Sequence, residues 1–428
     1  MMRNRCRSLS RLLFVVITLH WANFSNGDSA RHSFQIPLQD GTDINVEVAS
    51  SSGSQLVIWF IDHEEVRPQF EAMLKAINTN GFEVWRVDLL ADYFMPRSSE
   101  NVRTLPGEAV AAVIDAAHER SDKTIVLATY DRMPLPLLRG VRDWSAGFQG
   151  IARLAGSILY YPNLFGPPPV AGKAPQLGPV VAASNYPVVI VQPARGSQRW
   201  RLNDVMQAFW SAGAPAYVSL VPAIRDWFFM HPPGENPHET QATGDVPHQI
   251  VKFAALMQSE PKPETVIEMD VSPPGQASVR GLVPFASQSP APPLNLPDLT
   301  GGYQFPGYEG QVTLINFWAT WCPPCVEELP SLNRLKRRYT EQPFNLVSID
   351  FREIKPDLMQ FTKKIPVEFP ILLDLDGQTS LAWQVFSFPS SFLVDRSGRI
   401  RYSINRAIDW ETAEVFAIID SLLAETWN

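Results

Sequence analysis

The sequence VTLINFWATWCPPCVEELP, at residues 312–330, constrains the fold of this chain more than any other stretch. Residues 312–319 are mostly apolar, which is typical of a buried strand. Residues 326–339 follow as an amphipathic run and predict a helix. Cys322 therefore stands at the start of a helix that leaves a buried strand, and Cys325 lies one turn inside it.

The remaining cysteine lies in a segment with the pattern of an export signal. Residues 1–27 combine a basic start, a short apolar run and small residues suited to cleavage. An uncleaved N-terminal membrane anchor is the alternative, because aromatic residues prolong the apolar run. Cleavage would remove Cys6 and leave Cys322 and Cys325 as the cysteines of the exported chain.

Three roles are open to a pair of cysteines at this spacing. A structural disulfide is disfavoured, because the stabilisation grows with the length of the loop it closes and this loop is short. Zinc needs four ligands, or three and a water, yet the sequence has no second CxxC and no histidine after His248. Covalent haem needs a histidine directly after the second cysteine, where Val326 stands. A redox-active disulfide remains, without a metal or a separate cofactor.

The predicted position assigns a role to each thiol. Unpaired N–H groups and the helix dipole stabilise a thiolate at a helix N-terminus. Cys322 should be the exposed, attacking thiol, and Cys325 the more buried, resolving thiol. Pro323 and Pro324 suit the first turn, where their fixed φ and missing N–H are tolerated, and they should hold the two sulfurs close.

Residues 294–428 resemble the thioredoxin superfamily, and more narrowly the periplasmic TlpA/ResA-like thiol:disulfide oxidoreductases. The resemblance rests on VTLINFWATWCPPCVEELPSL, on FPSSFLVDRSGRI and on the predicted element order β-α-β-α-β-β-α. It implies a cis Pro389 beside the disulfide, with the Phe388 backbone free to pair with an extended substrate segment. The expected substrate-binding residues are Trp321, Pro323, Pro324 and Phe388.

Two further side chains refine the resemblance. Cytosolic thioredoxins have a buried aspartate two residues before the tryptophan of this strand, where this chain has Asn316. An asparagine cannot accept the proton of the buried thiol, so we assign proton transfer or pKa tuning to Glu328. The alternative for Glu328 is a surface glutamate favoured by the helix dipole, which is also the interpretation of Glu327.

Residues 33–258 alternate strand-like and helix-like runs, which predicts an α/β domain with a parallel, doubly wound sheet. The stretch GFEVWRVDLLADYF and the region after TIVLAT resemble an α/β-hydrolase of the virulence-associated esterase type. Residues 259–293 are rich in proline, serine, alanine and glutamine and predict an extended linker to the thioredoxin-like domain.

The hydrolase motif itself is degenerate. An active member would have G-x-S-x-G after TIVLAT, whereas Asp131 occupies the nucleophile position here and both glycines are missing. An aspartate nucleophile is chemically possible, but the acidic loop at residues 62–65 would oppose an oxyanion. The usual acid position, near residues 195–198, has no carboxylate, and the usual histidine position falls near residues 225–226.

We therefore expect the hydrolase chemistry to be lost and the N-terminal domain to serve as a module that docks an unknown protein or ligand. His231, His238 and His248 could bind a metal, but a solvated Pro-rich loop is the better interpretation, since they lack close metal-ligand spacing. The net charge of −8 argues against a nucleic-acid partner.

Together these patterns predict a periplasmic thiol:disulfide oxidoreductase that reduces disulfides of exported proteins. It would take its electrons from a membrane thiol-transfer protein. An oxidant or isomerase with the same site is one alternative. A hydrolase or binding module in the N-terminal domain, regulated by the redox pair, is the other.

Overall fold

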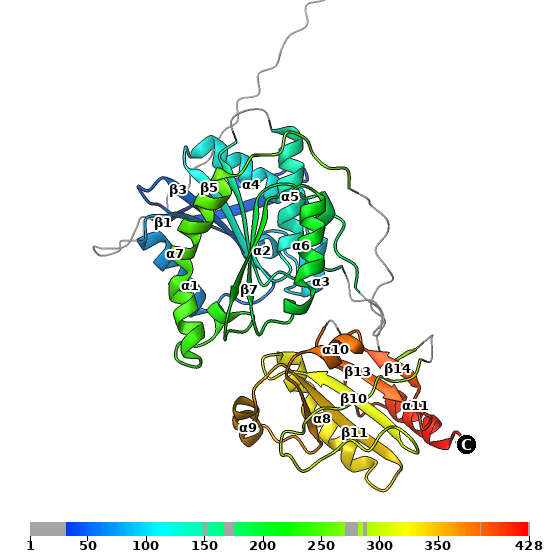
Figure 1. Ribbon diagram of the computed structural model, residues 1–428. Coiled ribbons are helices and arrows are strands. Elements are labelled where there is room, and N and C mark those ends of the chain that lie inside the picture. Colours follow the sequence, from blue (N-terminus) through cyan, green and yellow to red (C-terminus); the bar gives the residue numbers. More distant parts are fainter. Residues whose placement is uncertain are drawn as a thin grey trace, which may run out of the picture.

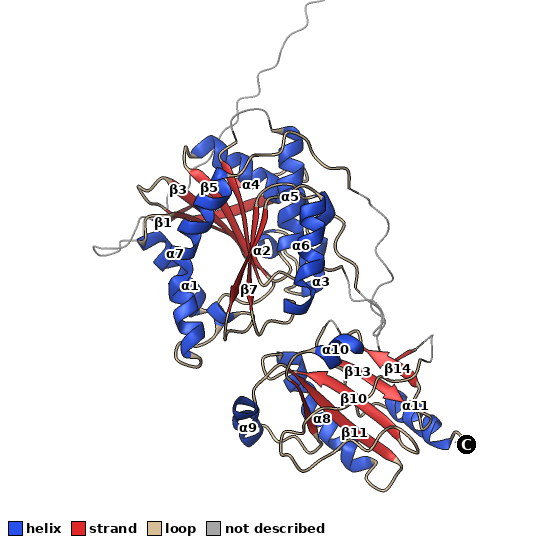
Figure 2. Ribbon diagram, in the orientation of Figure 1, coloured by secondary structure: helices blue, strands red, loops and turns tan. Residues whose placement is uncertain are grey.

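The computed structural model describes residues 31–148, 152–166, 175–269, 281–285, 289–385 and 387–426. The segment predicted as a signal or anchor, residues 1–27, lies outside them. The described residues form two α/β units, each built on its own sheet (Figures 1 and 2). No helix in these ranges is long and apolar enough to cross a membrane.

The N-terminal domain is built on an eight-stranded sheet with the order β1-β2-β4-β3-β5-β6-β7-β8. Strand β2 pairs antiparallel with both of its neighbours, and the remaining pairs are parallel. The strands are β1 (Arg31–Pro37), β2 (Asp43–Ala49), β3 (Gln55–Phe60), β4 (Glu83–Val87), β5 (Thr124–Tyr130), β6 (Leu154–Tyr160), β7 (Val188–Pro193) and β8 (Ala216–Val221). The mostly parallel α/β sheet predicted from the alternating pattern is therefore confirmed.

Helices cover both faces of this sheet, each face with its own apolar core. One core packs α4 (Gly107–Arg120), α5 (Pro134–Gly147) and α6 (Leu202–Ser211) against the sheet, and the other packs α1 (Pro68–Thr79) and α7 (Pro237–Ser259). Short helices α2 (Leu89–Asp92) and α3 (Ser99–Thr104) connect β4 to α4. Single-turn helices η1 (Val181–Ala183), η2 (Arg199–Arg201) and η3 (Phe228–Met230) lie in the later loops.

Two helices of this domain differ from the sequence prediction. Residues 134–147 were not predicted as a helix, yet α5 begins there with Pro134 and Pro136 in its first turn, where a missing N–H donor is tolerated. Residues 250–258, whose pattern predicts a closing helix for this domain, form only the end of α7, which begins at Pro237 and continues through Pro247. His238 and His248 therefore lie on the exposed side of a helix, and the predicted loop was wrong for them.

The C-terminal domain has a six-stranded sheet with the order β12-β11-β10-β13-β14-β9. Its elements are β9 (Val283–Pro284), β10 (Val312–Trp318), α8 (Pro323–Arg338), β11 (Phe344–Phe351), α9 (Lys355–Lys364), β12 (Ile371–Asp374), α10 (Gln378–Ala382), β13 (Ser390–Val394), β14 (Ile400–Ile404) and α11 (Ala413–Ala424). This is the thioredoxin fold predicted from the sequence. Beyond the predicted element order it has one more strand between β10 and β14, the short helix α10 and the edge strand β9.

The central strand β10 positions the cysteines. It is parallel to β11 and antiparallel to β13, and all seven of its residues are buried. Helices α8 and α11 pack on one face of this sheet, and Trp383 with the segment around Tyr303 and Tyr308 covers the other. Strand β9, which lies ahead of the predicted domain start at residue 294, pairs with β14 and extends the sheet at its edge.

Candidate active site

The two cysteines form a disulfide at the N-terminus of α8. Cys322 is the N-cap residue, and its sulfur accepts a hydrogen bond from the Cys325 backbone N–H at 3.3 Å. The exposed fractions are 5% for Cys322 and 0% for Cys325. Pro323 and Pro324 are exposed and occupy the first turn. Cys322 is therefore slightly more exposed than Cys325, but both are buried, so the exposed Cys322 expected from the sequence is not found in the disulfide form.

Aromatic side chains surround the approach to the disulfide. The Phe388–Pro389 peptide bond is cis, as the family resemblance implied. The Phe388 ring contacts the Trp321 ring edge to face, with centroids 5.7 Å apart, and the Phe351 ring at 4.9 Å. Phe388 and Trp321 are each half-buried, so they present an apolar surface beside the cysteines to an incoming chain.

Glu328 is buried on α8, with 3% of its surface exposed. It stands three residues after Cys325, a spacing that places two side chains on one face of a helix. Its Oε1 accepts a hydrogen bond from Asn316 Nδ2 at 2.8 Å, and its Oε2 accepts one from Trp410 Nε1 at 3.2 Å. Burial raises the pKa of Glu328 to about 7, although both hydrogen bonds oppose this shift.

Asn316 and Glu328, the two side chains that the sequence singled out, are therefore joined by a hydrogen bond. Because Glu328 is buried, it is not the surface glutamate considered as its alternative. Asn316 is fully buried on β10 and also donates to Ser391 Oγ at 3.0 Å. Glu327, by contrast, is exposed, as predicted. A carboxyl group with a pKa near neutrality is suited to accept and return a proton. Trp410 was missed as a partner, because nothing local in the sequence links it to α8.

A second carboxyl group, that of Glu353, binds the turn that precedes the cysteines, and the sequence did not point to it. Glu353, in the loop after β11, accepts hydrogen bonds from the Thr320 backbone N–H at 2.5 Å and from Thr320 Oγ1 at 2.6 Å. Glu353 is 4% exposed. The two loops meet because β10 and β11 are parallel neighbours whose carboxyl ends lie at one edge of the sheet.

In the N-terminal domain, Asp131 adopts the backbone conformation of a strand-to-helix elbow. It directly follows β5 and has a φ of 47°, which is uncommon for any residue except glycine. The nearby backbone N–H groups of Arg132 and Met133 point at another carboxylate: Asp62 Oδ2 accepts both, at 2.7 and 2.6 Å. In an active hydrolase the N–H after the nucleophile would bind the oxyanion. Here the fully buried Asp62 occupies that donor.

The charges around this elbow are paired within the protein. His63 Nδ1 hydrogen-bonds Asp62, and Arg132 Nη1 forms an ion pair with Asp131. Burial would raise the pKa of Asp62, but the hydrogen bond and charge of His63 outweigh it and lower that pKa. Burial raises the pKa of Asp131 against the opposing charge of Arg132. Ligand atoms of Asp62, His63 and Asp131 lie within 4.8 Å of one another, a grouping that the sequence analysis did not foresee.

The remaining hydrolase positions also hold paired groups. Asp226 is buried beside the loop after β7, where Ser197 donates to it from its backbone N–H and its hydroxyl, each at 2.8 Å. Burial raises the pKa of Asp226 to about 7. His231 hydrogen-bonds Glu239 at 2.8 Å, and Glu239 also binds Arg225. His231 is therefore half-buried within an ion-pair network and not in a solvated loop.

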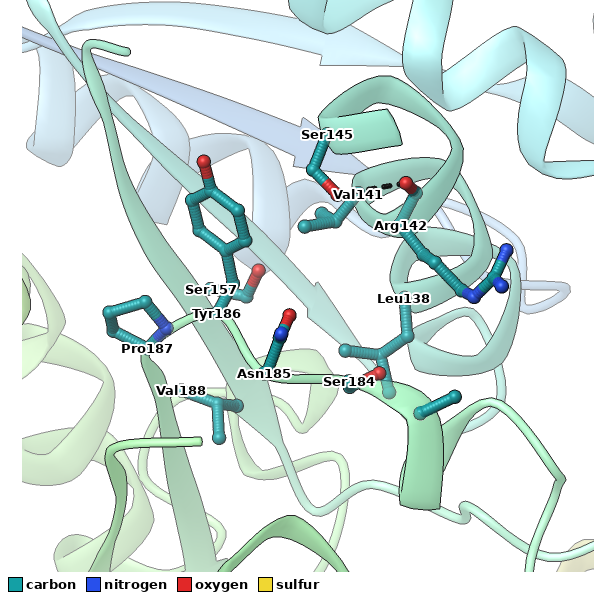
Figure 3. A pocket seen from close by; sticks show the side chains of 11 residues that line it. Leu138, Val141, Arg142, Ser145, Ser157, Ser184, Asn185, Tyr186, Pro187 and Val188 are labelled. Carbon is teal, nitrogen blue, oxygen red and sulfur yellow. Dashed lines mark hydrogen bonds between the residues drawn. The ribbon is translucent and has the colours of Figure 1, made fainter. Parts of the chain in front are cut away.

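Two hollows lie elsewhere in the N-terminal domain. One, between α5 and β7, has a cavity volume of about 10 Å³ and is lined by residues such as Arg142, Ser157 and Tyr186 (Figure 3); it is too small for an organic substrate. The other, about 460 Å³, is lined mainly by charged side chains, including Arg86 and Asp92. Neither of these two hollows is lined by Asp131.

The sheet order of the C-terminal domain and a disulfide at the start of α8 define a thioredoxin-like thiol–disulfide oxidoreductase. The AhpC/TSA family model matches residues 288–403. The thiol-disulfide oxidoreductase ResA of Geobacillus kaustophilus is 32% identical over 127 residues, which are 29% of this chain and 73% of that protein. ResA of Bacillus subtilis is 32% identical over 113 residues, or 26% of this chain and 63% of the relative. The chain therefore belongs, through its C-terminal domain, to the ResA-like thiol-disulfide oxidoreductases.

Solved structures match each domain in turn. A thiol:disulfide interchange protein from Chlorobium tepidum is 24% identical; the match covers 32% of this chain and 97% of that one, with a TM-score of 0.29 over the whole chain. Carboxyl esterase 2 from Tuber melanosporum is 11% identical; that match covers 54% of this chain and 89% of the esterase, with a TM-score of 0.41.

Proposed function

We propose that this chain is an exported thiol:disulfide oxidoreductase whose C-terminal domain reduces disulfides in other exported proteins. The observation that carries the proposal is the Cys322–Cys325 disulfide at the N-terminus of α8, with the buried carboxyl group of Glu328 three residues after Cys325 on the same helix. Such a site can pass two electrons and needs no further cofactor.

The exchange proceeds in two displacements on sulfur. The Cys322 thiolate attacks one sulfur of the substrate disulfide, a mixed disulfide forms, and the other substrate sulfur leaves as a thiolate that takes up a proton. Cys325 then loses its proton to Glu328 and attacks the Cys322 sulfur, which releases the second substrate thiol. The substrate gains two electrons and two protons, and the Cys322–Cys325 disulfide is formed.

The charges near the cysteines favour a reductant over an oxidant. Strong disulfide oxidants are oxidising because their reduced form is stabilised. Here one buried carboxyl group, Glu328, lies on α8 three residues after Cys325, and another, Glu353, binds Thr320 two residues before Cys322. When ionised they repel a thiolate and so oppose the helix dipole, which destabilises the reduced form. The pair should therefore give electrons readily.

The proposal requires an exported location and a source of electrons. The N-terminal pattern of residues 1–27 supports export to the periplasm, either as a cleaved chain or as an anchored one. After each turnover the Cys322–Cys325 disulfide must be reduced again, and a membrane thiol-transfer protein is the class of donor that can supply electrons there. We propose that the N-terminal domain docks a protein or ligand, because Asp62 and Arg132 fill the positions that hydrolysis would need.

Trapping the mixed disulfide tests the proposal. Cys325→Ser in the full chain, expressed in the native compartment, should accumulate disulfide-linked partners through Cys322, and Cys322→Ser/Cys325→Ser is the matched control without an attacking thiol. The equilibrium of the wild-type pair with glutathione should give a potential near or below that of thioredoxin, about −270 mV. A value near −120 mV, as for strong oxidants, would assign the oxidant role instead. Absence of trapped partners while Cys322 still reacts with a thiol reagent would refute the reductase role.

A further inference from the structure

Glu353 has no place in the displacement steps described above, although it contacts the segment that carries the attacking cysteine. Both of its carboxylate oxygens are used by one residue, Thr320, through the backbone N–H and the hydroxyl. Thr320 stands two positions before Cys322, in the turn that joins β10 to α8. A two-point contact of this kind fixes both the position and the orientation of the turn, whereas a single hydrogen bond would let it rotate.

The loop that carries Glu353 is itself held in an uncommon conformation. Arg352 has a φ of 62°, in the left-handed region that residues with a Cβ rarely adopt. Such a conformation persists only where surrounding contacts determine it. The Arg352 backbone N–H donates to Asp374 O at 3.0 Å, which secures this turn to β12. The chain therefore turns sharply to direct Glu353 back toward the cysteine turn.

Asp350 lies beneath Glu353 at the end of β11 and is fully buried. Its Oδ1 accepts the Glu353 backbone N–H at 3.1 Å. Among the described residues, no N–H or O–H donor reaches its Oδ2, whereas the Glu353 side chain lies within hydrogen-bonding reach of the Asp350 carboxyl group. Two carboxyl groups form a hydrogen bond only when one carries a proton. Both Glu353 oxygens already accept hydrogen bonds from Thr320, and burial, followed by the charge of Glu353, raises the pKa of Asp350 well above its ordinary value. We therefore place the proton on Asp350.

We propose that Glu353 is a positioning residue for thiol–disulfide exchange: its carboxylate holds Thr320, and with it Trp321 and Cys322, in the geometry that receives a substrate disulfide, while a protonated Asp350 holds Glu353. The inference rests on the proposed exchange at Cys322. It assigns to Asp350 the part of a hydrogen-bond donor, and to Glu353 that of the acceptor that holds the turn before the attacking thiol.

The assignment distinguishes two substitutions of the same residue. Asparagine at position 350 retains an acceptor for the Glu353 N–H and supplies a permanent donor to the Glu353 carboxylate, so Asp350→Asn should preserve the arrangement. Alanine removes both groups, so Asp350→Ala should release Glu353. An ionised Asp350 would instead repel Glu353, and the asparagine variant would then differ from the wild type as much as the alanine variant does.

The experiment compares full-length, reduced variants in stopped-flow reactions with insulin disulfides and in equilibria with glutathione. Glu353→Gln should lower the rate constant with insulin about tenfold, since small displacements of reacting groups have effects of this size or larger. It should also shift the glutathione equilibrium about tenfold toward the dithiol, or about 30 mV, because a charge beside the thiolate is lost. Glu327→Gln, which removes an exposed carboxylate from α8, is the matched control and should change each quantity less than twofold.

Further variants keep the proposal testable if Glu353→Gln folds poorly. Thr320→Val keeps the backbone N–H and loses only the hydroxyl, so it should lower the insulin rate about threefold and leave the glutathione equilibrium unchanged. Asp350→Asn should restore at least half of the rate that Asp350→Ala loses. Equal behaviour of Glu353→Gln and Glu327→Gln, or of Asp350→Asn and Asp350→Ala, would overturn the inference. A wild-type chain that is inert toward both disulfides would overturn the proposed function, and this inference with it.

Discussion

Replacing Glu328 by glutamine should destabilise the C-terminal domain at acid pH and stabilise it at alkaline pH. Folding raises the pKa of this carboxyl group from 4.5 to about 7, chiefly by burial. The folded state therefore favours the protonated carboxyl group. Its contribution to the free energy of unfolding is fully present below pH 4.5 and is lost as the pH rises toward 7, because ionising the buried group destabilises the folded chain. A difference of this size corresponds to about 3 kcal/mol once the group is ionised in both states.

The glutamine side chain is neutral at every pH, so the variant does not lose stability through ionisation at this position as the pH rises. It also lacks one acceptor, because an amide oxygen cannot serve both Asn316 Nδ2 and Trp410 Nε1 as the two carboxyl oxygens do; one lost hydrogen bond costs about 1 kcal/mol. Glu328→Gln should therefore be less stable than the wild type by about 1 kcal/mol at pH 4 and more stable by about 2 kcal/mol at pH 8.

Hydrogen exchange of the oxidised full-length protein in increasing urea measures this difference, since peptides from β10 and α8 report on the C-terminal domain alone. Glu327→Gln is the control, because Glu327 is exposed on the same helix. Parallel pH dependences for the wild type and Glu328→Gln would show that Glu328 is ionised without penalty. The reasoning that gives it a neutral-range pKa would then fail.

Three other predictions concern single side chains. Trp410→Phe removes a donor to Glu328, so the midpoint of the pH profile for Cys325 attack should rise by about one pH unit; an unchanged profile would separate Trp410 from the proton transfer. Asp62→Ala leaves two N–H groups without their acceptor. The N-terminal domain should therefore lose several kcal/mol of stability, about 1–3 for each group. Hydrogen exchange of peptides from β5 and α5 measures this loss, and insulin reduction should not change. Asp131→Asn should leave p-nitrophenyl acetate hydrolysis at the wild-type level, and abolition of a measurable activity would restore the hydrolase interpretation.

The C-terminal fold could be predicted because its signals are local. A buried strand, a CxxC pair and an amphipathic helix are contiguous in the sequence, and their order fixes where the cysteines lie. In the N-terminal domain the strands were equally clear, but α5 was hidden by Pro134 and Pro136. Proline argues against a helix unless the first turn is known to begin there, and the sequence does not mark that position.

Around the elbow at Asp131, the sequence predicted the acidic loop but not the tertiary contacts of the carboxylates. The acidic loop that includes Asp62 was expected to oppose an oxyanion, and the structure gives the reason in atomic terms: its carboxylate accepts the N–H groups of Arg132 and Met133. The pairing of Asp226 with Ser197 was not foreseen. The sequence analysis looked for a carboxylate in the loop after β7, whereas Asp226 reaches that place from the loop after β8.

In the redox site, one important glutamate could be predicted from the sequence and the other could not. Glu328 could be predicted, because Asn316 stands where cytosolic thioredoxins have a buried aspartate and Glu328 lies on the second turn of the predicted helix, where the resembling family often has a glutamate. Glu353 is 31 residues from Cys322 in sequence, and its contact with Thr320 depends on the pairing of β10 with β11 and on the left-handed turn at Arg352. Neither can be inferred from composition or spacing. A residue that acts through tertiary contact is thus visible only in the folded chain, even where the chemistry it supports is evident from the sequence.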